Sequence, residues 1–581
     1  MRIVIVGGVA AGMSAAARAR RLDENAEIIV LERGEHVSYA TCGLPYYVGG
    51  EIEDAASLLV QTPESLRAAL ALDVRTRHEV TAIDPVARTV TVHSDRGVET
   101  IEYDALVLAP GAVAVRPPIP GLDSPRVHTL RTVSDALALR SAVTDSAPPV
   151  ATEPARESAR QAVVLGAGFI GLEAAEALAR QGVRVSLVEL ADHVLPPLDE
   201  EMAFFVADEL DRLGVTVHTG SGTREIIPGA AHDTVVLTDG TRLPADLIVL
   251  SVGARPDTAF VERAGIRCEN GAIVTDDHGR TSVPGIWAAG DAVVSTDAVT
   301  GLRRPVALAG PANRAGRLVA DDILRPGAAR PWPRPTGTAI VRVGRLTAAM
   351  TGANRASLTA AGIPFRTIHL HPDQHASYFP GASAIHLLVH MRDDDGLLLG
   401  AQAVGADGVD KRIDVLATAI RAGLTAPDLI DLDLAYAPPY GQAKDPVNLA
   451  GLVAANVLDG TLRLWYAQDL PTVRQTALLL DVRSRREYCA GHLPGSLNIP
   501  HTQLRDRLDE VRQAAAGRPV RVLCASGVRS ALAHRILVQA GFDSASLSGG
   551  LLTLRAVHRD DTGPRAEAAR PTGGPRAGRR P

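Results

Sequence analysis

The chain has 581 residues, of which 46% are hydrophobic, and a formal net charge of −6 at pH 7. At roughly 100–200 residues per domain, this length predicts several domains, each with an apolar core. The weak negative charge lacks the signature of a nucleic-acid binder, and no run of about 18 or more apolar residues predicts a membrane-spanning helix. We therefore expect neither a nucleic-acid nor a membrane partner.

The four cysteines, Cys42, Cys268, Cys489 and Cys524, are spread along the chain without a closely spaced pair. Such spacing in a long chain is not typical of a disulfide framework or a zinc site, so we expect no metal. The expected compartment is the reducing cytoplasm, and glycines within the apolar N-terminal run argue against a signal peptide. A cysteine with a special role is then expected to be catalytic.

Residues 2–6 predict a short strand, followed by glycines, an Ala-rich helix to about Leu22 and a second strand that ends at Glu32. The same succession returns over 162–189, where the second strand ends at Glu189. Two units of this kind in one chain predict two dinucleotide sites.

The second glycine set is complete, with Gly166, Gly168 and Gly171 between strand and helix. The first glycine permits the tight turn, the second lets the backbone approach a pyrophosphate, and the third lets the helix pack on the strand. Glu189 is placed to bond a ribose 2′-hydroxyl and would repel a 2′-phosphate. This unit therefore predicts NADH as the nucleotide in preference to NADPH.

The first glycine set departs from the pattern, because Val9 stands where the middle glycine is expected, between Gly7 and Gly12. The acid at the end of the second strand, Glu32, is retained and is followed by Arg33. This unit by itself is an incomplete dinucleotide signature.

Two later segments strengthen it. Residues 281–291 form an apolar strand that ends in Gly-Asp291, and residues 108–111 include Ala109 and Gly111. A carboxylate after such a strand suits the ribityl chain of a flavin. Both segments resemble the FAD-contacting parts of flavoprotein reductases with two dinucleotide domains, and this resemblance implies FAD in the first unit and NAD(P)H in the second.

Cys42 lies just after the first unit, in a segment, 38–46, that resembles the single-cysteine motif of the coenzyme A disulfide reductases. Many flavin disulfide reductases carry a second cysteine five positions later, but here that residue is Tyr47. A thiolate at Cys42 can attack one sulfur of a disulfide or persulfide and form a mixed disulfide or a cysteine persulfide. Reduced flavin would then return the electrons.

The same resemblance implies coenzyme A as a substrate or a bound group. The matching positions are Ser14, Arg18, Arg21, Ser38 and Thr41, although Thr41 stands where Asn is common in the family. Arg18 and Arg21 lie one helical turn apart, and guanidinium groups suit phosphates. A solvated basic face is the alternative interpretation of this pair.

Two tyrosine segments further along resemble family segments of a dimerisation domain. The resemblance implies that Tyr378 and Tyr436 reach the cysteine of a partner subunit and stabilise its thiolate, and that Lys444 contacts substrate. It also implies a homodimer.

The segments 480–483 and 487–496 resemble the opening of a rhodanese domain. A strand then delivers Cys524 into a loop of six residues that ends at Arg529 and leads into a helix. Backbone N–H groups in such a loop point inward and stabilise a thiolate or a persulfide. Related phosphatase loops are one residue longer, so this loop suits a sulfur atom.

The expected fold is α/β, with two Rossmann-like dinucleotide-binding domains, an α+β dimerisation domain and a C-terminal α/β rhodanese domain. Pro-rich stretches at 145–160 and 325–337 predict a linker and a break. The expected boundaries are 1–145 and 255–325 for FAD binding, 146–254 for NAD(P)H binding, 330–450 for dimerisation, 465–556 for rhodanese, and 557–581 for a disordered tail.

The expected function is FAD-dependent reduction of coenzyme A persulfide or polysulfide by NAD(P)H, with release of sulfide and with Cys524 carrying sulfane sulfur. One alternative is coenzyme A disulfide reduction. Another is an NADH oxidase or peroxidase, in which a single cysteine cycles through sulfenic acid. A third is a sulfur-relay or sensing protein, against which the dinucleotide motifs argue. The rhodanese segment favours the persulfide.

Overall fold

The computed structural model describes residues 1–144 and 160–558 of the chain. Almost all of the predicted linker and of the predicted disordered tail lies outside the described residues. The chain divides into two compact units, which we describe separately. The first comprises Met1–Leu198 and Val206–Ile363, and the second comprises Asp199–Phe205 and the chain from Pro364 onward. Among the described residues, no helix combines the length and apolar character needed to cross a membrane.

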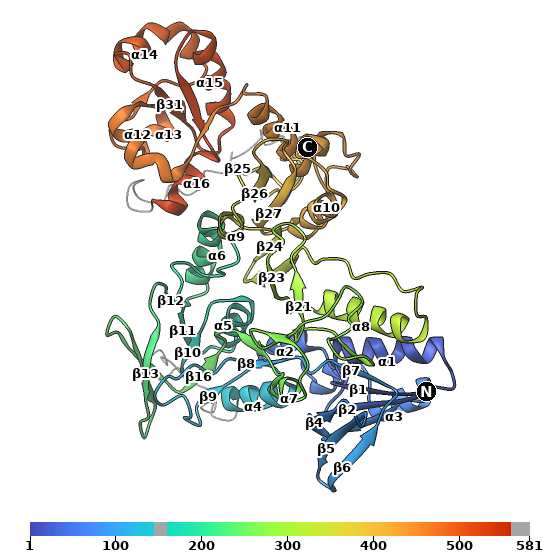
Figure 1. Ribbon diagram of the computed structural model, residues 1–581. Coiled ribbons are helices and arrows are strands. Elements are labelled where there is room, and N and C mark those ends of the chain that lie inside the picture. The colour runs from blue at the N-terminus through green and yellow to red at the C-terminus, as the bar shows by residue number, and fades with distance from the viewer. Residues whose placement is uncertain (145–159, 559–581) are drawn as a thin grey trace, which may run out of the picture. The chain divides into compact units, whose positions relative to one another are not determined.

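The first dinucleotide unit is a five-stranded parallel sheet in the order β20-β7-β1-β2-β3. The predicted strand, turn, helix and strand are all present. The strands are buried on both faces, because α1 and α8 lie side by side on one face and the antiparallel sheet β4-β5-β6 covers the other (Figure 1). The bounds are β1 Arg2–Val6, α1 Ala10–Leu22, β2 Glu27–Glu32, β3 Asp73–Thr76, β4 Glu79–Asp84, β5 Thr89–Ser94, β6 Gly97–Glu102, β7 Ala105–Leu108, β20 Ile286–Ala288 and α8 Ala309–Leu324.

The second dinucleotide unit repeats this plan with a parallel sheet in the order β12-β11-β10-β16-β9. The predicted succession over 162–189 is confirmed, except that the last strand ends at Val188, one residue before Glu189. The bounds are β9 Val127–His128, α4 Val133–Thr144, β10 Gln161–Leu165, α5 Phe169–Arg180, β11 Arg184–Val188, α6 Glu200–Arg212, β12 Thr216–His218 and β16 Leu247–Leu250.

Smaller elements complete the first unit. The predicted break at 325–337 contains neither helix nor strand, and an antiparallel pair of strands, β23 and β24, follows it. The remaining bounds are η1 Thr41–Gly43, α2 Leu44–Val48, η2 Ala55–Leu58, α3 Pro63–Leu70, β8 Ala112–Ala114, β13 Thr223–Ile227, β14 Asp233–Leu237, β15 Arg242–Ala245, β17 Ala254–Pro256, α7 Ala259–Arg263, β18 Cys268–Glu269, β19 Ala272–Ile273, β21 Val294–Thr296, β22 Arg303–Pro305, β23 Ala339–Val343, β24 Leu346–Gly352 and α9 Arg355–Ala360.

From Pro364 onward, the second unit first contains three antiparallel strands, β25, β26 and β27, and two helices. The two helices are α10 and α11. Asp445 caps α11 through the backbone N–H of Val447 at 3.1 Å. The bounds are β25 Phe365–Leu370, β26 Ile385–Arg392, β27 Leu398–Gly405, α10 Val409–Ala422, η3 Pro427–Asp431 and α11 Pro446–Leu458.

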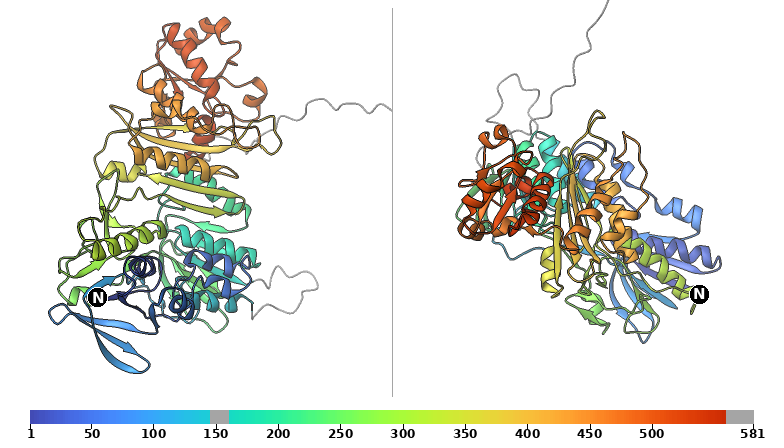
Figure 2. Two further views of the ribbon diagram at one scale, coloured as in Figure 1. Left: turned by 90° about the vertical axis from the view of Figure 1, so that its right-hand side faces the viewer. Right: turned by 90° about the horizontal axis from the view of Figure 1, so that it is seen from above.

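The last part of the second unit is a parallel sheet in the order β28-β32-β31-β29-β30. Helices flank this sheet (Figure 2), and separate apolar clusters fill its two faces, one with α12 and α16, the other with α14 and α15. The bounds are β28 Leu464–Trp465, η4 Ala467–Asp469, α12 Leu470–Thr476, β29 Leu478–Asp481, α13 Arg485–Cys489, β30 Leu497–Asn498, η5 Leu504–Arg507, α14 Leu508–Ala515, β31 Val520–Leu523, α15 Val528–Gln539, β32 Ser544–Leu547 and α16 Gly550–Val557.

Candidate active sites

Cys42 lies in the short turn η1, directly before helix α2. Ser38, which precedes this turn, has a left-handed backbone with φ 47°, and its N–H donates to the carbonyl of Gly8 at 2.8 Å. The Cys42 segment is thereby fixed to the first glycine turn. Cys42 is solvent-exposed in the single chain, as is the neighbouring Thr41.

The surroundings of Cys42 favour its neutral thiol. Desolvation by nearby protein atoms raises the pKa of the Cys42 thiol, and the negative charges of Glu173 and Asp291 raise it further. A thiolate at this position therefore needs stabilisation from a hydrogen-bond donor or a positive charge beyond these groups.

Glu173 on α5 is a functional candidate that the sequence patterns did not reveal. It accepts a hydrogen bond from the hydroxyl of Tyr46 at 3.2 Å, and burial raises its pKa to about 7. Burial and Glu173 in turn raise the pKa of Tyr46 to about 12. A carboxyl that titrates near neutrality beside a cysteine turn is typical of sites that move protons. The available signal was its position two residues after Gly171.

The acid Glu32 lies at the first glycine turn and accepts two backbone hydrogen bonds. One oxygen of Glu32 accepts from the N–H of Gly8 at 2.8 Å, and the other accepts from the N–H of Gly34 at 2.7 Å. A Cβ on Gly7 would lie 2.0 Å from the carbonyl oxygen of Ala109, which explains why the two segments can approach. A Cβ on Gly12 would lie 1.9 Å from the carbonyl oxygen of Gly7.

The other predicted flavin contacts belong to the same unit. Asp291 follows β20, burial raises the pKa of its carboxyl, and the guanidinium of Arg131 lies 3.9 Å away. Gly111 faces open space, because a Cβ there would meet no atom within 4 Å. Arg33 makes an ion pair with Asp257, so its charge is already partnered.

The second glycine turn shows two kinds of glycine. A Cβ on Gly171 would lie 1.9 Å from the carbonyl oxygen of Gly166, so close packing excludes any side chain. A Cβ on Gly168 would meet no atom within 4 Å, which leaves room for a ligand at the start of α5. Glu189 accepts from the N–H groups of Ala167 and Ala191, at 2.7 and 2.9 Å.

The predicted coenzyme A residues on α1 differ in their contacts. Ser14 donates to the side-chain oxygen of Asn313 at 2.6 Å, and Arg18 donates twice to Asp321, at 2.8 and 2.6 Å. Arg21 is exposed, as is Lys444 in the second unit. Arg18 is therefore partly neutralised within the chain, and Arg21 is the more accessible of the two guanidiniums.

The structure brings the two predicted tyrosines together. The hydroxyl oxygens of Tyr378 and Tyr436 lie 3.3 Å apart, and the hydrogen bond between them raises the pKa of Tyr378. The two side chains are 75% and 49% exposed. With Phe379 and Tyr440, which are 37% and 73% exposed, they form an aromatic surface on the second unit.

Cys524 is buried at the end of β31, where its sulfur accepts from the N–H groups of Gly527 and Ser530 at 3.2 and 3.4 Å. Its thiol donates to the hydroxyl of Ser530 at 3.4 Å. These donors would stabilise negative charge on this sulfur. Arg529 pairs with both carboxylate oxygens of Glu487, at 2.8 and 2.7 Å. This pair lowers the pKa of Glu487 to about 2. The same pair raises the pKa of Arg529, and negative charge on Cys524 raises it further.

Comparison with protein families agrees with this geometry. The model of the pyridine nucleotide-disulphide oxidoreductase family matches residues 1–316, more than half of the chain. The chain belongs to this family. The dimerisation domain of the pyridine nucleotide-disulphide oxidoreductases matches residues 338–446, and the rhodanese-like domain matches residues 465–555. The fold is therefore the predicted combination of two dinucleotide-binding units, a dimerisation domain and a rhodanese domain.

Three similar proteins each match more than three quarters of this chain. The coenzyme A disulfide reductase of Staphylococcus haemolyticus is 34% identical over 459 residues, which are 78% of this chain and 100% of that protein. The reduced CoADR-RHD of Bacillus anthracis has a TM-score of 0.91 and 38% identity, over 97% of this chain and 99% of that one. A NAD-dependent persulfide reductase from A. fulgidus has a TM-score of 0.88 and 37% identity, over 95% and 100%.

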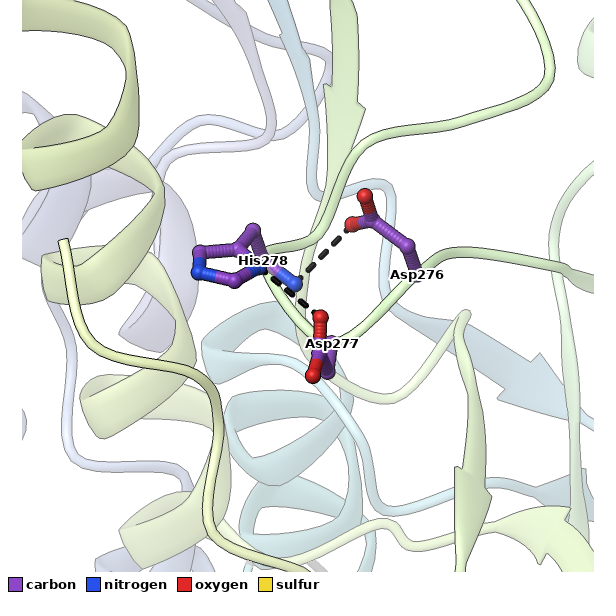
Figure 3. A group of neighbouring side chains, drawn as sticks. All are labelled: Asp276, Asp277 and His278. Atoms are coloured by element: carbon purple, nitrogen blue, oxygen red, sulfur yellow. Dashed lines mark hydrogen bonds and ion pairs between the residues drawn. The ribbon is translucent and has the colours of Figure 1, made fainter. Parts of the chain in front are cut away.

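One further cluster in this oxidoreductase has metal-ligand residue types. Asp276, Asp277 and His278 lie together in a loop of the first unit (Figure 3). Asp276 accepts from the backbone N–H groups of His278 and Arg280, both at 2.9 Å, and His278 Nδ1 lies 2.8 Å from Asp277. These bonds form a turn in which the carboxylates already have partners.

Proposed function

We propose that the protein is an FAD-dependent, NADH-driven reductase of coenzyme A persulfide or polysulfide, with Cys42 as the attacking thiol. The observation that carries this proposal is the pairing of two different thiols in one chain. Cys42 is an exposed thiol fixed to the first glycine turn, and Cys524 is a buried thiol in a cradle of N–H groups. The similarity to a persulfide reductase over nearly the whole chain supports the same function.

The residues present fit both cofactors. Gly111 and Gly168 leave open space where ligand atoms can approach the backbone. FAD would be held by the first glycine turn and Asp291, and NADH by the second glycine turn and Glu189, whose carboxylate disfavours a 2′-phosphate. When bound, these cofactors supply the two electrons of the reaction.

Cys42 performs the sulfur chemistry. Its thiolate attacks the outer sulfur of coenzyme A persulfide, so that the sulfur–sulfur bond of the substrate breaks and coenzyme A leaves as a thiolate that takes a proton. Cys42 then carries a persulfide, and two electrons and a proton release hydrogen sulfide and restore the thiolate. The overall balance is one persulfide, one NADH and one proton converted to coenzyme A, hydrogen sulfide and NAD⁺.

The thiolate needs donors that the first unit does not provide, because Glu173 and Asp291 oppose its charge. We assign this role to Tyr378 and Tyr436 of a partner subunit, with Lys444 at the substrate. Their exposure and the matching dimerisation domain support a homodimer. A second copy of the chain would cover the aromatic surface.

Coenzyme A would lie along α1 and the Cys42 turn. Arg21 and Arg18 supply positive charge for its phosphates, while Ser14, Ser38 and Thr41 supply polar groups near its thiol end. All four cysteines are free thiols, which supports a reducing compartment and hence the cytoplasm.

Cys524 would carry sulfane sulfur as a persulfide. Its buried sulfur has N–H donors on one side, and Arg529 supplies positive charge close by. A substrate anion such as thiosulfate would meet this charge at the loop.

Coenzyme A disulfide reduction is the second candidate, and the named relatives favour it over oxidase, peroxidase or relay functions. In that reaction Cys42 would attack the disulfide and form a mixed disulfide with coenzyme A. The rhodanese-like domain would then have a separate task.

The deciding experiment is anaerobic turnover of the purified yellow protein with NADH and, in parallel, coenzyme A persulfide and coenzyme A disulfide. We expect rapid NADH loss with stoichiometric sulfide from the persulfide. Rapid turnover of the disulfide alone would overturn the proposal in favour of the second candidate. In a separate aerobic control without any sulfur substrate, rapid NADH loss would indicate an oxidase.

A further inference from the structure

Arg412 on α10 is a buried cation outside the thiol sites. It is 2% exposed, and its guanidinium donates to both carboxylate oxygens of Asp445, at 3.3 and 2.7 Å. It also donates to the backbone carbonyls of Gln374 at 2.8 Å and Gly408 at 3.2 Å. Burial of a charged pair costs free energy that apolar packing would not, so the pair's value lies in the geometry that it fixes.

The bond from Arg412 to Gln374 anchors the loop that carries Tyr378. Gln374 closes this loop at its base, because its N–H donates to the carbonyl of Ser383 at 2.8 Å and its side chain donates to the carbonyl of Gly381 at 3.3 Å. Tyr378 therefore stands on a loop whose base is held by the buried guanidinium.

Asp445 and Lys411 anchor the segment that carries Tyr436 and Lys444. Asp445 directly follows Lys444 and caps α11. Lys411 donates to the carbonyl of Ala435, the residue before Tyr436, at 3.3 Å, and lies 3.8 Å from Asp445. One cluster of charges thus fixes the backbone beside Tyr436 and beside Lys444.

The two segments also contact one another directly. The N–H of Ala376 donates to the carbonyl of Gly441 at 2.9 Å, and the side chain of Gln442 donates to the carbonyl of Asp373. The loops are therefore one assembly whose charged centre is Arg412.

Apolar packing around the two tyrosines is limited, because Tyr378 is 75% exposed and Tyr436 is 49% exposed. A cavity of about 410 Å³ opens beside Tyr436 and is lined in part by Lys411, Arg412 and Tyr440. Apart from the hydrogen bond between the two hydroxyls, the orientation of the rings depends on the backbone that carries them. That backbone is held by the polar contacts of Arg412, Asp445 and Lys411.

We propose that Arg412, together with Asp445 and Lys411, is the positioning group that holds Tyr378, Tyr436 and Lys444 in the arrangement required at Cys42 of the partner subunit. This inference rests on the proposed function. The tyrosines touch the reacting thiol, and Arg412 acts only through them. A displacement of about 1 Å at such groups can cost up to about 100-fold in rate.

The test compares Arg412→Met and Asp445→Asn with a control, Arg421→Met, which removes an exposed arginine from the same helix. The full-length dimeric flavoprotein is assayed for reduction of its flavin by NADH, for turnover of coenzyme A persulfide, and for alkylation of Cys42 as a function of pH. We expect flavin reduction within about twofold of wild type in all three variants. Turnover should fall roughly 10- to 100-fold in the first two variants only.

The alkylation profile separates positioning from general damage. The pKa of the Cys42 thiol should rise by the same amount in Arg412→Met and in the double variant Tyr378→Phe/Tyr436→Phe, and combining all three changes should raise it no further. Wild-type turnover and an unchanged thiol pKa in Arg412→Met would overturn the inference, as would full additivity with the tyrosine changes. If Arg412→Met fails to fold, Asp445→Asn and Lys411→Met give the same readouts and decide the inference by the same criteria.

The failure of the proposed function has a different signature. Normal turnover in Cys42→Ser would remove the thiol mechanism whatever Arg412 does. Normal turnover in Tyr378→Phe/Tyr436→Phe would remove the role of the tyrosines, and the positioning inference would be overturned with it.

Discussion

The hydroxyl of Tyr46 donates to the carboxylate of Glu173 over 3.2 Å, and this contact joins the helix that follows Cys42 to the helix that begins at the second glycine turn. The carboxyl is half-buried, and its desolvation raises its pKa to about 7. The charge of Glu173, which opposes a negative charge on Cys42, therefore changes near neutral pH.

Glu173→Gln should make Cys42 more acidic. Above about pH 7 the wild-type carboxylate is charged and raises the pKa of the thiol, whereas glutamine carries no charge. We expect Cys42 to be alkylated roughly two- to tenfold faster in the variant above that pH. The rates should converge at lower pH, where Glu173 is already neutral. Mass spectrometry of the Cys42 peptide measures the rate, and Glu53→Gln, an exposed carboxylate, is the control. Identical profiles would show that Glu173 does not act on the thiol.

The two glycines of the second turn give a matched pair of variants. Gly171→Ala would place a Cβ 1.9 Å from a carbonyl oxygen, so we expect a loss of several degrees in Tm. Gly168→Ala meets no protein atom within 4 Å and has φ −75°, so the fold should tolerate it. It should nevertheless raise the KM for NADH by about tenfold or more, because the methyl group occupies the ligand's approach. A normal KM in a folded Gly168→Ala protein would move the nucleotide elsewhere.

Cys42→Ser should abolish NADH oxidation that depends on sulfur substrates, because a hydroxyl cannot attack the persulfide at neutral pH. Anaerobic reduction of the flavin by NADH should continue, since it does not use the thiol. Stopped-flow absorbance separates the two steps. Sulfide release at the wild-type rate is the result that contradicts the assignment.

Cys524→Ser should leave the reduction of free coenzyme A persulfide intact and remove thiosulfate sulfurtransferase activity. In the proposed function the two thiols have different tasks, and the N–H groups around Cys524 lose their role without its sulfur. Glu487→Gln should weaken sulfurtransferase activity more mildly, because Arg529 keeps its charge and loses only its orientation. Parallel assays of both activities on the two variants test this division. Loss of persulfide reduction in Cys524→Ser would imply obligatory sulfur transfer between the thiols.

The sequence predicted the parallel units well, because glycines and apolar runs mark the strands and turns locally. It did not reveal Glu173, whose raised pKa arises from burial beside Tyr46, more than a hundred residues earlier. The sequence also did not reveal the role of Arg412, because a helical pattern would place this arginine in solvent. Its partner in the fold, Asp445, lies 33 residues later in the chain. The contact of Arg18 with Asp321, 303 residues apart, is tertiary in the same way.

The exposure of Tyr378 and Tyr436 has a genetic consequence if their target lies on another chain. A dimer of Cys42→Ser subunits and a dimer of Tyr378→Phe/Tyr436→Phe subunits would both be inactive, yet a hybrid of the two would contain one site with a wild-type thiol facing wild-type phenols. Co-expression of two defective alleles would then restore activity that neither allele supplies alone. Strong dilution of the wild-type protein would separate its subunits and abolish its activity.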